Sequence, residues 1–358
     1  MVPAPETGKI VLIANPVAKS GRGAAAADEA TRLLWDRVGE ERVEVLYTAR
    51  PLHAVELAAG LGSDVGCVIA LGGDGLVNEV ANGLMKRPRD ERPALAVIPV
   101  GSGNDYAATL GMAYQVGPAV SQILHFRTAH ADVGCVNGRY YVETLSFGLD
   151  AAIALDTMER RKRTGRSGTV LYLESAVDQL FNHLNTYEFT LSLEGEEAAA
   201  SATSAEDATS AASATSAGEP TTPTPAGEPT SMAEPATSVA EKEGDSRVVS
   251  AEAYLVAVQV GPTYGGHFRI TPDAHIDDGL LDVCWATPKL APLRALAVLL
   301  RARAGKHVGN PHVHFAQASC LLLDFAQEPP AQIDGEKITG THFEISCVPD
   351  ALTVVLGS

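Results

Sequence analysis

Apolar and polar positions alternate regularly along the first third of the chain. Four runs rich in apolar residues predict strands, over residues 10–14, 43–47, 67–71 and 95–99, and the first of them is expected to be buried. Helical patterns lie between them, from the Ala-rich stretch that ends near residue 35, over 53–61, and from residue 76 onward. Alternating strands and helices joined by short glycine turns are typical of a doubly wound parallel sheet with helices on both faces. We therefore expect an α/β domain over residues 1–127.

The pattern changes to a series of strands after residue 128. Apolar runs predict strands over 140–146, 187–193, 248–260, 280–285, 321–325, 344–348 and 352–356. Two helical patterns interrupt them, at about 169–184 and 292–303. Many strands separated by loop signals favour an antiparallel sandwich or barrel. The sequence thus predicts a second, β-rich sandwich domain over residues 128–358.

Residues 195–247 are a low-complexity segment of Ala, Ser, Thr, Pro and Glu. Such a composition offers too little apolar surface to offset the entropy of ordering, so we expect a disordered insertion. It lies between two predicted strands, which indicates a hairpin-like connection enlarged by extra residues. The entropy of closing a loop grows only slowly with its length, so the fold should tolerate the insertion.

Composition excludes several classes of protein. The chain has 358 residues and a formal net charge of −17, which argues against binding to nucleic acid. No stretch approaches the roughly 18 to 20 apolar residues of a membrane-spanning helix. The start lacks the features of a secretory signal, and the five cysteines form no Cys-x-x-Cys pair. We expect a cytoplasmic protein with reduced thiols.

Three polar turns rich in glycine each follow a predicted strand. They lie at Asn15-Pro16 with residues 19–23, at 72–75 (Gly-Gly-Asp-Gly), and at 101–105 (Gly-Ser-Gly-Asn-Asp). Ligands of open α/β sheets bind beyond the carboxyl ends of the strands. Glycines let the backbone approach a phosphate closely, and the N–H groups at the start of a helix favour an anion. Asp74 would repel a phosphate, so we expect it to hold Mg²⁺ or the loop itself. The standard P-loop and dinucleotide fingerprints are missing.

The second and third of these turns, with their flanking residues 72–79 and 99–107, resemble the diacylglycerol kinase catalytic-domain family. This family comprises bacterial lipid kinases and their sphingosine and ceramide kinase relatives. Residues 261–266, 272–283 and 334–336 match the family's signatures in the second domain. The resemblance spans nearly the whole chain except the insertion, although the Gly-Gly-Asp-Gly turn alone is shared with NAD kinases. It implies an NAD kinase-like and diacylglycerol kinase-like fold.

The resemblance implies transfer of the γ-phosphoryl group of ATP to a lipid hydroxyl, with Mg²⁺ as cofactor. The acceptor would be diacylglycerol, a sphingoid base or another membrane lipid alcohol. The family's nucleotide-contacting positions fall here on Asn15, Thr48, Gly72, Gly73, Asp74, Gly75, Leu76, Val77, Asn78, Gly101, Ser102 and Asn104.

Two acidic sites in the second domain also follow from the resemblance. Glu336 would accept the proton of the lipid hydroxyl, with Asp334 sharing or orienting that role; on one strand the two side chains would share a face. The alternative for this pair is a solvated turn. A structural Mg²⁺ would be held by the Asp278 carboxylate and the carbonyls of His275 and Leu280, and the alternative there is a tight acidic loop.

The chain departs from the family at three positions. Leu76 stands where the family usually has Thr, which removes a hydroxyl that could contact phosphate. Ser102 replaces a common Thr and keeps its hydroxyl. His267 replaces the third glycine that is expected after Gly265 and Gly266.

One dense basic run stands out in this acidic chain. Arg160, Arg161, Lys162 and Arg163 form either a solvated face or a peripheral contact with anionic lipid headgroups. A lipid kinase without a membrane-spanning helix must visit the bilayer surface, which favours the second interpretation. The sequence leaves a homodimer open.

Two other functions compete with a lipid kinase. One is an NAD kinase-like phosphotransferase with a soluble acceptor, against which the turn at 101–105 argues. The other is a nucleotide or lipid sensor that keeps the fold without catalysis, an alternative that Leu76 leaves open.

Overall fold

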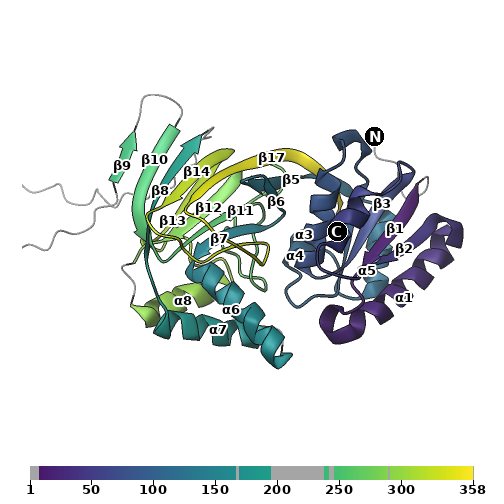
Figure 1. Ribbon diagram of the computed structural model, residues 1–358, viewed down its shortest axis with the longest axis horizontal. Coiled ribbons are helices and arrows are strands. Elements are labelled where there is room, and N and C mark those ends of the chain that lie inside the picture. The colour runs from purple at the N-terminus through teal and green to yellow at the C-terminus, as the bar shows by residue number, and fades with distance from the viewer. Residues whose placement is uncertain (1–7, 167–168, 195–237, 242–245, 289–290, 358) are drawn as a thin grey trace, which may run out of the picture.

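The computed structural model describes residues 8–166, 169–194, 238–241, 246–288 and 291–357. These residues form two halves that lie side by side and are joined by one long strand, β17 (His342–Val355) (Figure 1). The N-terminal half is an α/β unit and the other half is a β-sandwich with helices on one side.

The N-terminal half confirms the predicted doubly wound sheet. Its strands pair in parallel in the order β2 (Val43–Tyr47), β1 (Lys9–Ala14), β3 (Val65–Gly72) and β4 (Ala94–Pro99). Strands β3 and β4 are buried along their whole length, because helices cover both faces of the sheet. These helices are α1 (Ala18–Val38), α2 (His53–Ala59), α3 (Asp74–Met85), α4 (Asp105–Thr109) and α5 (Val116–His125).

The C-terminal half confirms the predicted sandwich. One sheet has six strands in the order β13 (Val313–Ala318), β12 (Leu281–Ala286), β11 (Leu255–Gln259), β7 (Thr144–Gly148), β15 (Ala331–Ile333) and β16 (Glu336–Ile338). The facing layer continues from β17 through β14 (Cys320–Phe325), β8 (Tyr187–Glu194), β10 (Ser246–Ala253) and β9 (Ser238–Glu241). Phe147, Trp285 and Phe343 meet in the core between the two layers.

Three helices cover the outer face of the six-stranded sheet: α6 (Leu149–Thr164), α7 (Thr169–Asn182) and α8 (Pro292–Ala302) (Figure 1). They pack with Ala257, Cys284 and Val313 of that sheet in a small core of their own. Helices α7 and α8 agree with the predicted ranges, whereas α6 has only a weak apolar periodicity and was not expected as a helix.

Strand β17 connects the cores of the two halves. It pairs with β14 in the sandwich, with β5 (Thr128–Val136) along most of its length, and with β4 in parallel at Val354. Strand β5 also pairs with β6 (Arg139–Tyr141). Leu352 and Val354 are buried in the core of the N-terminal half, together with Ala131 and Val133. The α/β core therefore takes residues from the end of the chain as well as from its first third.

Four predicted strands differ from those observed. The run at 248–260 is two strands, because the chain passes at Tyr254 from the sheet of β10 to that of β11. The run at 140–146 is broken at Val142 and Glu143, whose N–H groups donate to Asp334 and not to a neighbouring strand. The runs at 344–348 and 352–356 are one strand, with an irregularity in register between them.

The expected insertion at 195–247 lies mostly outside the described residues. Its described parts, 238–241 and 246–247, are strand and not disordered. The hairpin-like connection is confirmed, because β8 and β10 pair antiparallel from Glu194 and Ser246 onward. No helix in the described ranges is long and apolar enough to cross a membrane.

Candidate functional site

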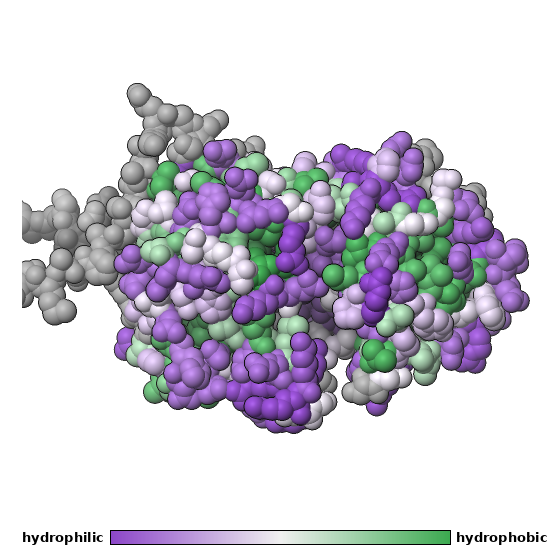
Figure 2. All heavy atoms as spheres, in the orientation of Figure 1, coloured by the Kyte–Doolittle hydropathy of each residue, from purple (hydrophilic) through white to green (hydrophobic). Residues whose placement is uncertain are grey.

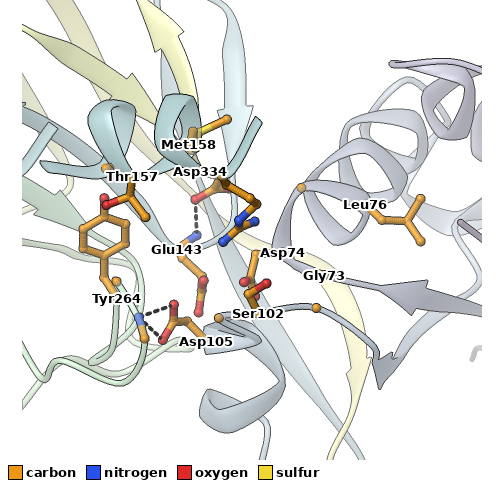
Figure 3. A pocket seen from close by; sticks show the side chains of 18 of the residues that line it. Gly73, Asp74, Leu76, Ser102, Asp105, Glu143, Thr157, Met158, Tyr264 and Asp334 are labelled. Atoms are coloured by element: carbon orange, nitrogen blue, oxygen red, sulfur yellow. Dashed lines mark hydrogen bonds between the residues drawn. The ribbon is translucent and has the colours of Figure 1, made fainter. Parts of the chain in front are cut away.

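A cleft of about 450 Å³ lies between the two halves (Figure 3). Figure 2 shows the hollow between the halves, with hydrophilic side chains over the neighbouring tips of α6 and α7. The N-terminal wall consists of the turns after β1, β3 and β4. The opposite wall consists of the loop before β7 with Thr144, the loop at 264–266, the turn between β15 and β16, and helices α6 and α7. The carboxyl ends of the parallel strands thus face acidic side chains of the sandwich.

The turns after β3 and β4 contact each other through main-chain atoms of Gly73 and Gly101, with no side chain between them. A Cβ atom on Gly101 would lie 2.4 Å from the Cα of Gly73 and 2.6 Å from Oδ1 of Asn104, so no side chain fits there. The N–H of Val100 donates to the carbonyl of Gly72 at 2.7 Å. Glycine at both contact positions therefore leaves main-chain groups on the floor of the cleft.

Gly101→Ala should separate these two turns. We expect a loss of about 2 kcal/mol in the free energy of unfolding, because the added methyl overlaps backbone atoms. Gly75→Ala is the matched control for stability, since a Cβ there meets nothing within 4 Å among the described residues. Equal unfolding free energies for the two variants would contradict the prediction.

Asp74 joins the two turns. It begins helix α3, and its carboxylate accepts the N–H of Asn104 at 2.8 Å and that of Tyr106 at 3.4 Å. Burial raises its pKa to about 7, and the neighbouring charge of Asp105 adds to the shift. Of the two roles expected for Asp74, the loop-holding one corresponds to these contacts.

Asn104 shapes the second turn from within. Its φ of 62° is left-handed, its Oδ1 accepts the N–H of Gly101 at 2.7 Å, and its Nδ2 donates to the Gly101 carbonyl at 3.1 Å. These bonds occupy the side chain, which is buried. Asn104 therefore supports the main chain of the turn.

Leu76 fills space beneath the first turn. Its side chain is buried in the N-terminal core, close enough to Gly72 that a Cβ there would lie 2.6 Å from its Cδ2. The N–H groups of Leu76 and Val77 both donate to the carbonyl of Gly73. These two amides belong to the first turn of α3 and are therefore already paired within the helix.

Asp334 ties the two halves together. Its carboxylate accepts the N–H groups of Val142 at 2.8 Å and Thr144 at 2.8 Å, and more weakly that of Glu143 at 3.3 Å. Asn78, on α3 of the other half, donates to it at 2.7 Å. Burial raises the pKa of Asp334, and these hydrogen bonds oppose the rise.

Glu336 is held more loosely than Asp334. It lines the cleft at the start of β16, its side chain is about two-fifths exposed, and Nη2 of Arg139 lies 2.7 Å from its Oε2. The prediction that both acids share one face of a strand is wrong. Asp334 and Gly335 form the tight turn between β15 and β16, and both have positive φ. The turn nonetheless places both acids on the cleft wall.

The structure adds two acids that the sequence did not single out. Asp105 is buried and accepts the N–H of Gly266 at 2.9 Å and that of His267 at 2.6 Å, so it links α4 to the sandwich. Glu143 is 3% exposed and lines the cleft, and its Oε1 has no hydrogen-bond partner among the described residues. Burial raises the pKa of Glu143 well above its usual value, with the charges of Asp74 and Asp105 contributing.

Not all the expected nucleotide-contacting residues reach the cleft. Those that line it are Asn15, Gly73, Asp74, Gly75, Leu76, Gly101 and Ser102. Within the described residues, five others lie outside the lining: Thr48, Gly72, Val77, Asn78 and Asn104. Lys19 also faces the cleft, and residues 19–23, expected as a turn, belong to the start of α1.

The loop at 275–280 lies apart from the cleft. Oδ1 of Asp278 accepts the N–H of Leu280 at 3.0 Å, and Asp132 accepts the N–H of Gly279 at 2.6 Å. The expected donors, one carboxylate and the carbonyls of His275 and Leu280, are all oxygen atoms, which suits Mg²⁺. Across the described ranges, no three His, Cys, Asp or Glu side chains are grouped to hold a metal, so such a site would depend on main-chain oxygens and water.

The basic run on α6 divides into three environments. Arg160 pairs with Asp156 at 2.6 Å and also with Asp178, and is therefore neutralised within the fold. Arg161 lines the cleft, while Lys162 and Arg163 are exposed. Arg160 is therefore not available to lipid headgroups, whereas a contact through the exposed residues of the run stays a prediction.

Asp150 lies at the start of α6, near Tyr172 and Tyr264 of the cleft wall. Its Oδ1 accepts a hydrogen bond from Tyr172 at 3.5 Å, and its Oδ2 has no partner within the described part of the chain. Burial raises the pKa of Asp150 to about 7. Between about pH 4 and pH 7, therefore, the Asp150 carboxyl keeps its proton in the folded protein, whereas the unfolded chain, with a pKa near 3.9, has released it.

The contribution of Asp150 to folding stability should consequently decrease as the pH rises from about 4 through 7. Asp150→Asn removes this titration, so the wild type should lose about 2–3 kcal/mol more than the variant between pH 5 and pH 8. Urea unfolding of both proteins at the two pH values measures the difference. Asp90→Asn, at an exposed position, should follow the wild type. Parallel curves for wild type and Asp150→Asn would contradict the assignment.

Comparison with known proteins places the fold and the site in context. Residues 9–136 match the model of the diacylglycerol kinase catalytic domain, and residues 233–356 match that of the YegS C-terminal NAD kinase beta sandwich-like domain. A diacylglycerol kinase of Bacillus subtilis is 26% identical over 285 residues, which cover 79% of this chain and 75% of the relative. A probable lipid kinase YegS-like of Yersinia pestis is 26% identical over 299 residues, covering 83% and 80%.

Solved structures agree with the fold. The crystal structure of a putative diacylglycerol kinase from Bacillus anthracis superposes with a TM-score of 0.70, at 20% identity, over 98% of this chain and 96% of the other. A second structure of a putative diacylglycerol kinase from the same organism gives a TM-score of 0.69 at 19% identity, over 97% of each chain. Both halves and their arrangement are therefore shared with these proteins.

Proposed function

We propose that this chain, which belongs to the diacylglycerol kinase family of lipid kinases, transfers the γ-phosphoryl group of ATP to the hydroxyl of a membrane lipid. It would thus act as a phosphotransferase with an alcohol acceptor, as the names of its relatives indicate. Diacylglycerol or a sphingoid lipid is the proposed acceptor. The observation that supports this proposal is the cleft, where two bare glycine turns face the acids of the sandwich.

The N-terminal wall of the cleft has groups that could bind a triphosphate. The main chain at Gly73 and Gly101 lets phosphate oxygens approach closely, and the Ser102 hydroxyl is a further donor. Lys19 and Arg161, on opposite walls, bring positive charge to the cleft. Phosphoryl transfer depends mainly on positioning and on such charge stabilisation.

Glu336 is the proposed proton acceptor. Its carboxylate reaches the cleft and makes one exposed ion pair, so it is available to a lipid hydroxyl. Asp334 is occupied by three main-chain N–H groups and the Asn78 amide, so its proposed role is to position the turn that carries Glu336. The two acids thus receive different proposed roles, proton acceptor for Glu336 and support of the turn for Asp334, which the sequence alone could not distinguish.

Mg²⁺ is the proposed metal. When bound with ATP it neutralises the charge that develops on the phosphate oxygens. Glu143 fits it best, because its unpartnered Oε1 lies buried in the cleft lining near Asp74. The loop at 275–280 would hold a separate structural Mg²⁺ through Asp278, His275 and Leu280.

The sandwich side of the cleft suits a lipid. Ala154, Met158, Tyr172 and Tyr264 present apolar surface beside the acids. A glycerol or sphingoid hydroxyl could therefore approach Glu336 while the attached chains lie along α6 and α7.

Incubation of the purified protein with labelled ATP, Mg²⁺ and a total lipid extract tests the proposal. We expect label in a lipid phosphate, with none in the Glu336→Gln variant, and no label on NAD offered as an alternative acceptor. Labelling of NAD would favour the NAD kinase-like function. Binding of ATP without transfer to any lipid would favour a sensor.

A further inference from the structure

Helix α8 leaves large apolar side chains in solvent. Leu293 is 71% exposed and Leu300, seven residues later on the same face, is 49% exposed. Its opposite face is buried through Ala302 and partly through Val298 and Leu299. Helix α8 thus has apolar residues on two sides. One side packs in the core, and the other is not covered by any described part of the chain.

Helix α7 has the same character. Its exposed apolar residues recur at helical spacing, at Val170, Leu173, Val177 and Phe181. The inner face of α7 buries Ala176 and places Tyr172 on the wall of the cleft. One side of this helix therefore belongs to the candidate active site, and the other faces solvent.

The two exposed stripes lie on one side of the sandwich half. Helices α7 and α8 are in contact, and both bury their inner faces in the small core outside the six-stranded sheet (Figure 1). Their outer faces point away from that common core. We call the surface formed by Val170, Leu173, Val177, Phe181, Leu293 and Leu300 the α7–α8 face.

Exposed basic residues flank this face on the side of α8 and at the end of α6, although the protein as a whole carries −17. The two acids of α7, Glu174 and Asp178, are paired with Arg166 and Arg160. Residues 291–309 contain Arg294, Arg301, Arg303 and Lys306 and no Asp or Glu. All four basic residues are exposed, and Lys162 and Arg163 are exposed at the end of neighbouring α6. An exposed apolar stripe with basic flanks is typical of a helix that lies in the surface of an anionic bilayer.

We propose that the α7–α8 face docks the protein on an anionic lipid bilayer, with its leucines, valines and phenylalanine among the acyl chains and the arginines at the headgroups. The inference rests on the proposed lipid substrate, which α7 would meet at the bilayer and pass to the cleft beside Tyr172. It moves the centre of the membrane contact from the basic run at 160–163, of which Arg160 is paired within the fold, to α7 and α8. A second copy of the chain is less suited to this face, because identical basic rims would oppose each other.

Flotation of the full-length protein with phosphatidylcholine vesicles, with and without 30% phosphatidylglycerol, tests the docking surface. We expect binding to the anionic vesicles and at least a tenfold loss of affinity in Leu293→Asp/Leu300→Asp. A similar loss should follow from Arg294→Ser/Arg303→Ser on anionic vesicles. Leu300→Asp alone should weaken binding, whereas the control Leu52→Asp, at a position 51% exposed on the N-terminal half, should not.

A water-soluble short-chain diacylglycerol separates docking from catalysis. The Leu293→Asp/Leu300→Asp variant should phosphorylate it at the wild-type rate and lose activity only on vesicles. Unchanged vesicle binding by this variant would overturn the docking proposal and leave the kinase proposal intact. Vesicle binding through this face without phosphorylation of any lipid would overturn the kinase proposal and leave the docking proposal intact. A change from dimer to monomer in sedimentation, with vesicle binding unaltered, would assign the face to a second copy and also overturn the proposal.

Discussion

Replacement of Glu336 by Gln is expected to lower kcat at least 100-fold while the free energy of unfolding stays within about 1 kcal/mol of the wild-type value. Removal of a general base typically costs 10²- to 10⁴-fold in rate. The stability change should be small because the carboxylate makes an ion pair with Arg139 in which both partners are about half exposed. Steady-state kinetics with Mg²⁺·ATP and dispersed diacylglycerol, together with urea unfolding, measure both quantities.

Arg139→Gln provides the matched control for Glu336→Gln. It removes the same ion pair but keeps the carboxylate in the cleft, so kcat should change only a few-fold. Should Glu336→Gln retain more than half of the wild-type kcat, the proton must go to another group. Equal losses in the two variants would show that the ion pair matters and the carboxylate by itself does not.

Asp334→Asn should behave differently, with a loss of about 2–4 kcal/mol in the free energy of unfolding and no measurable activity. Asn tolerates the left-handed backbone of this position, where φ is 44°, so the change isolates the carboxylate. Its amide group would face main-chain N–H donors that now bond to oxygen, which leaves buried donors unsatisfied. Thermal and urea unfolding report the stability, and the lipid kinase assay reports the activity.

Asn78→Ala separates the contact between the halves from the rest of this network. It removes one donor to Asp334 and should cost about 1 kcal/mol, with partial loss of activity. If Asp334→Asn unfolds like the wild type and only its rate falls, Asp334 acts in the reaction itself and not as the support of the turn. That outcome would reverse the roles we propose for the two acids.

Much of the fold could be predicted because its signals are local. The parallel strands β1, β3 and β4 are apolar runs, and β3 and β4 end at glycine turns, so their type and order of appearance follow from neighbouring residues. The family signatures that cluster at residues 72–79 and 99–107 carried the resemblance to lipid kinases. Helix α6 was missed because its last turns are charged and only its inner face is apolar.

The roles of individual residues were harder to predict. Asn104 lies within a glycine turn and Thr48 directly follows strand β2. Asn104 nevertheless bonds to its own turn, and the N–H of Thr48 donates to the carbonyl of Ala14. Glu143 interrupts what reads as one continuous strand, and no motif marks it. Its burial in the cleft wall follows from Asp334, which draws the loop before β7 out of the sheet.

Local patterns of residues are enough to predict the two kinds of half, the bare turns at Gly73 and Gly101, and an acidic pair near the end of the chain. The folded chain was needed to show that Asn78 contacts Asp334, 256 positions away, and that hydrogen bonds occupy Asp334 while Glu336 stays accessible. It was also needed to show that the outer stripes of α7 and α8 are exposed among the described residues. The difference lies in the sequence separation of the interacting residues. Strand and helix periodicity arises between residues a few positions apart, whereas burial, charge and hydrogen-bond partners depend on which distant segments the closed fold brings together.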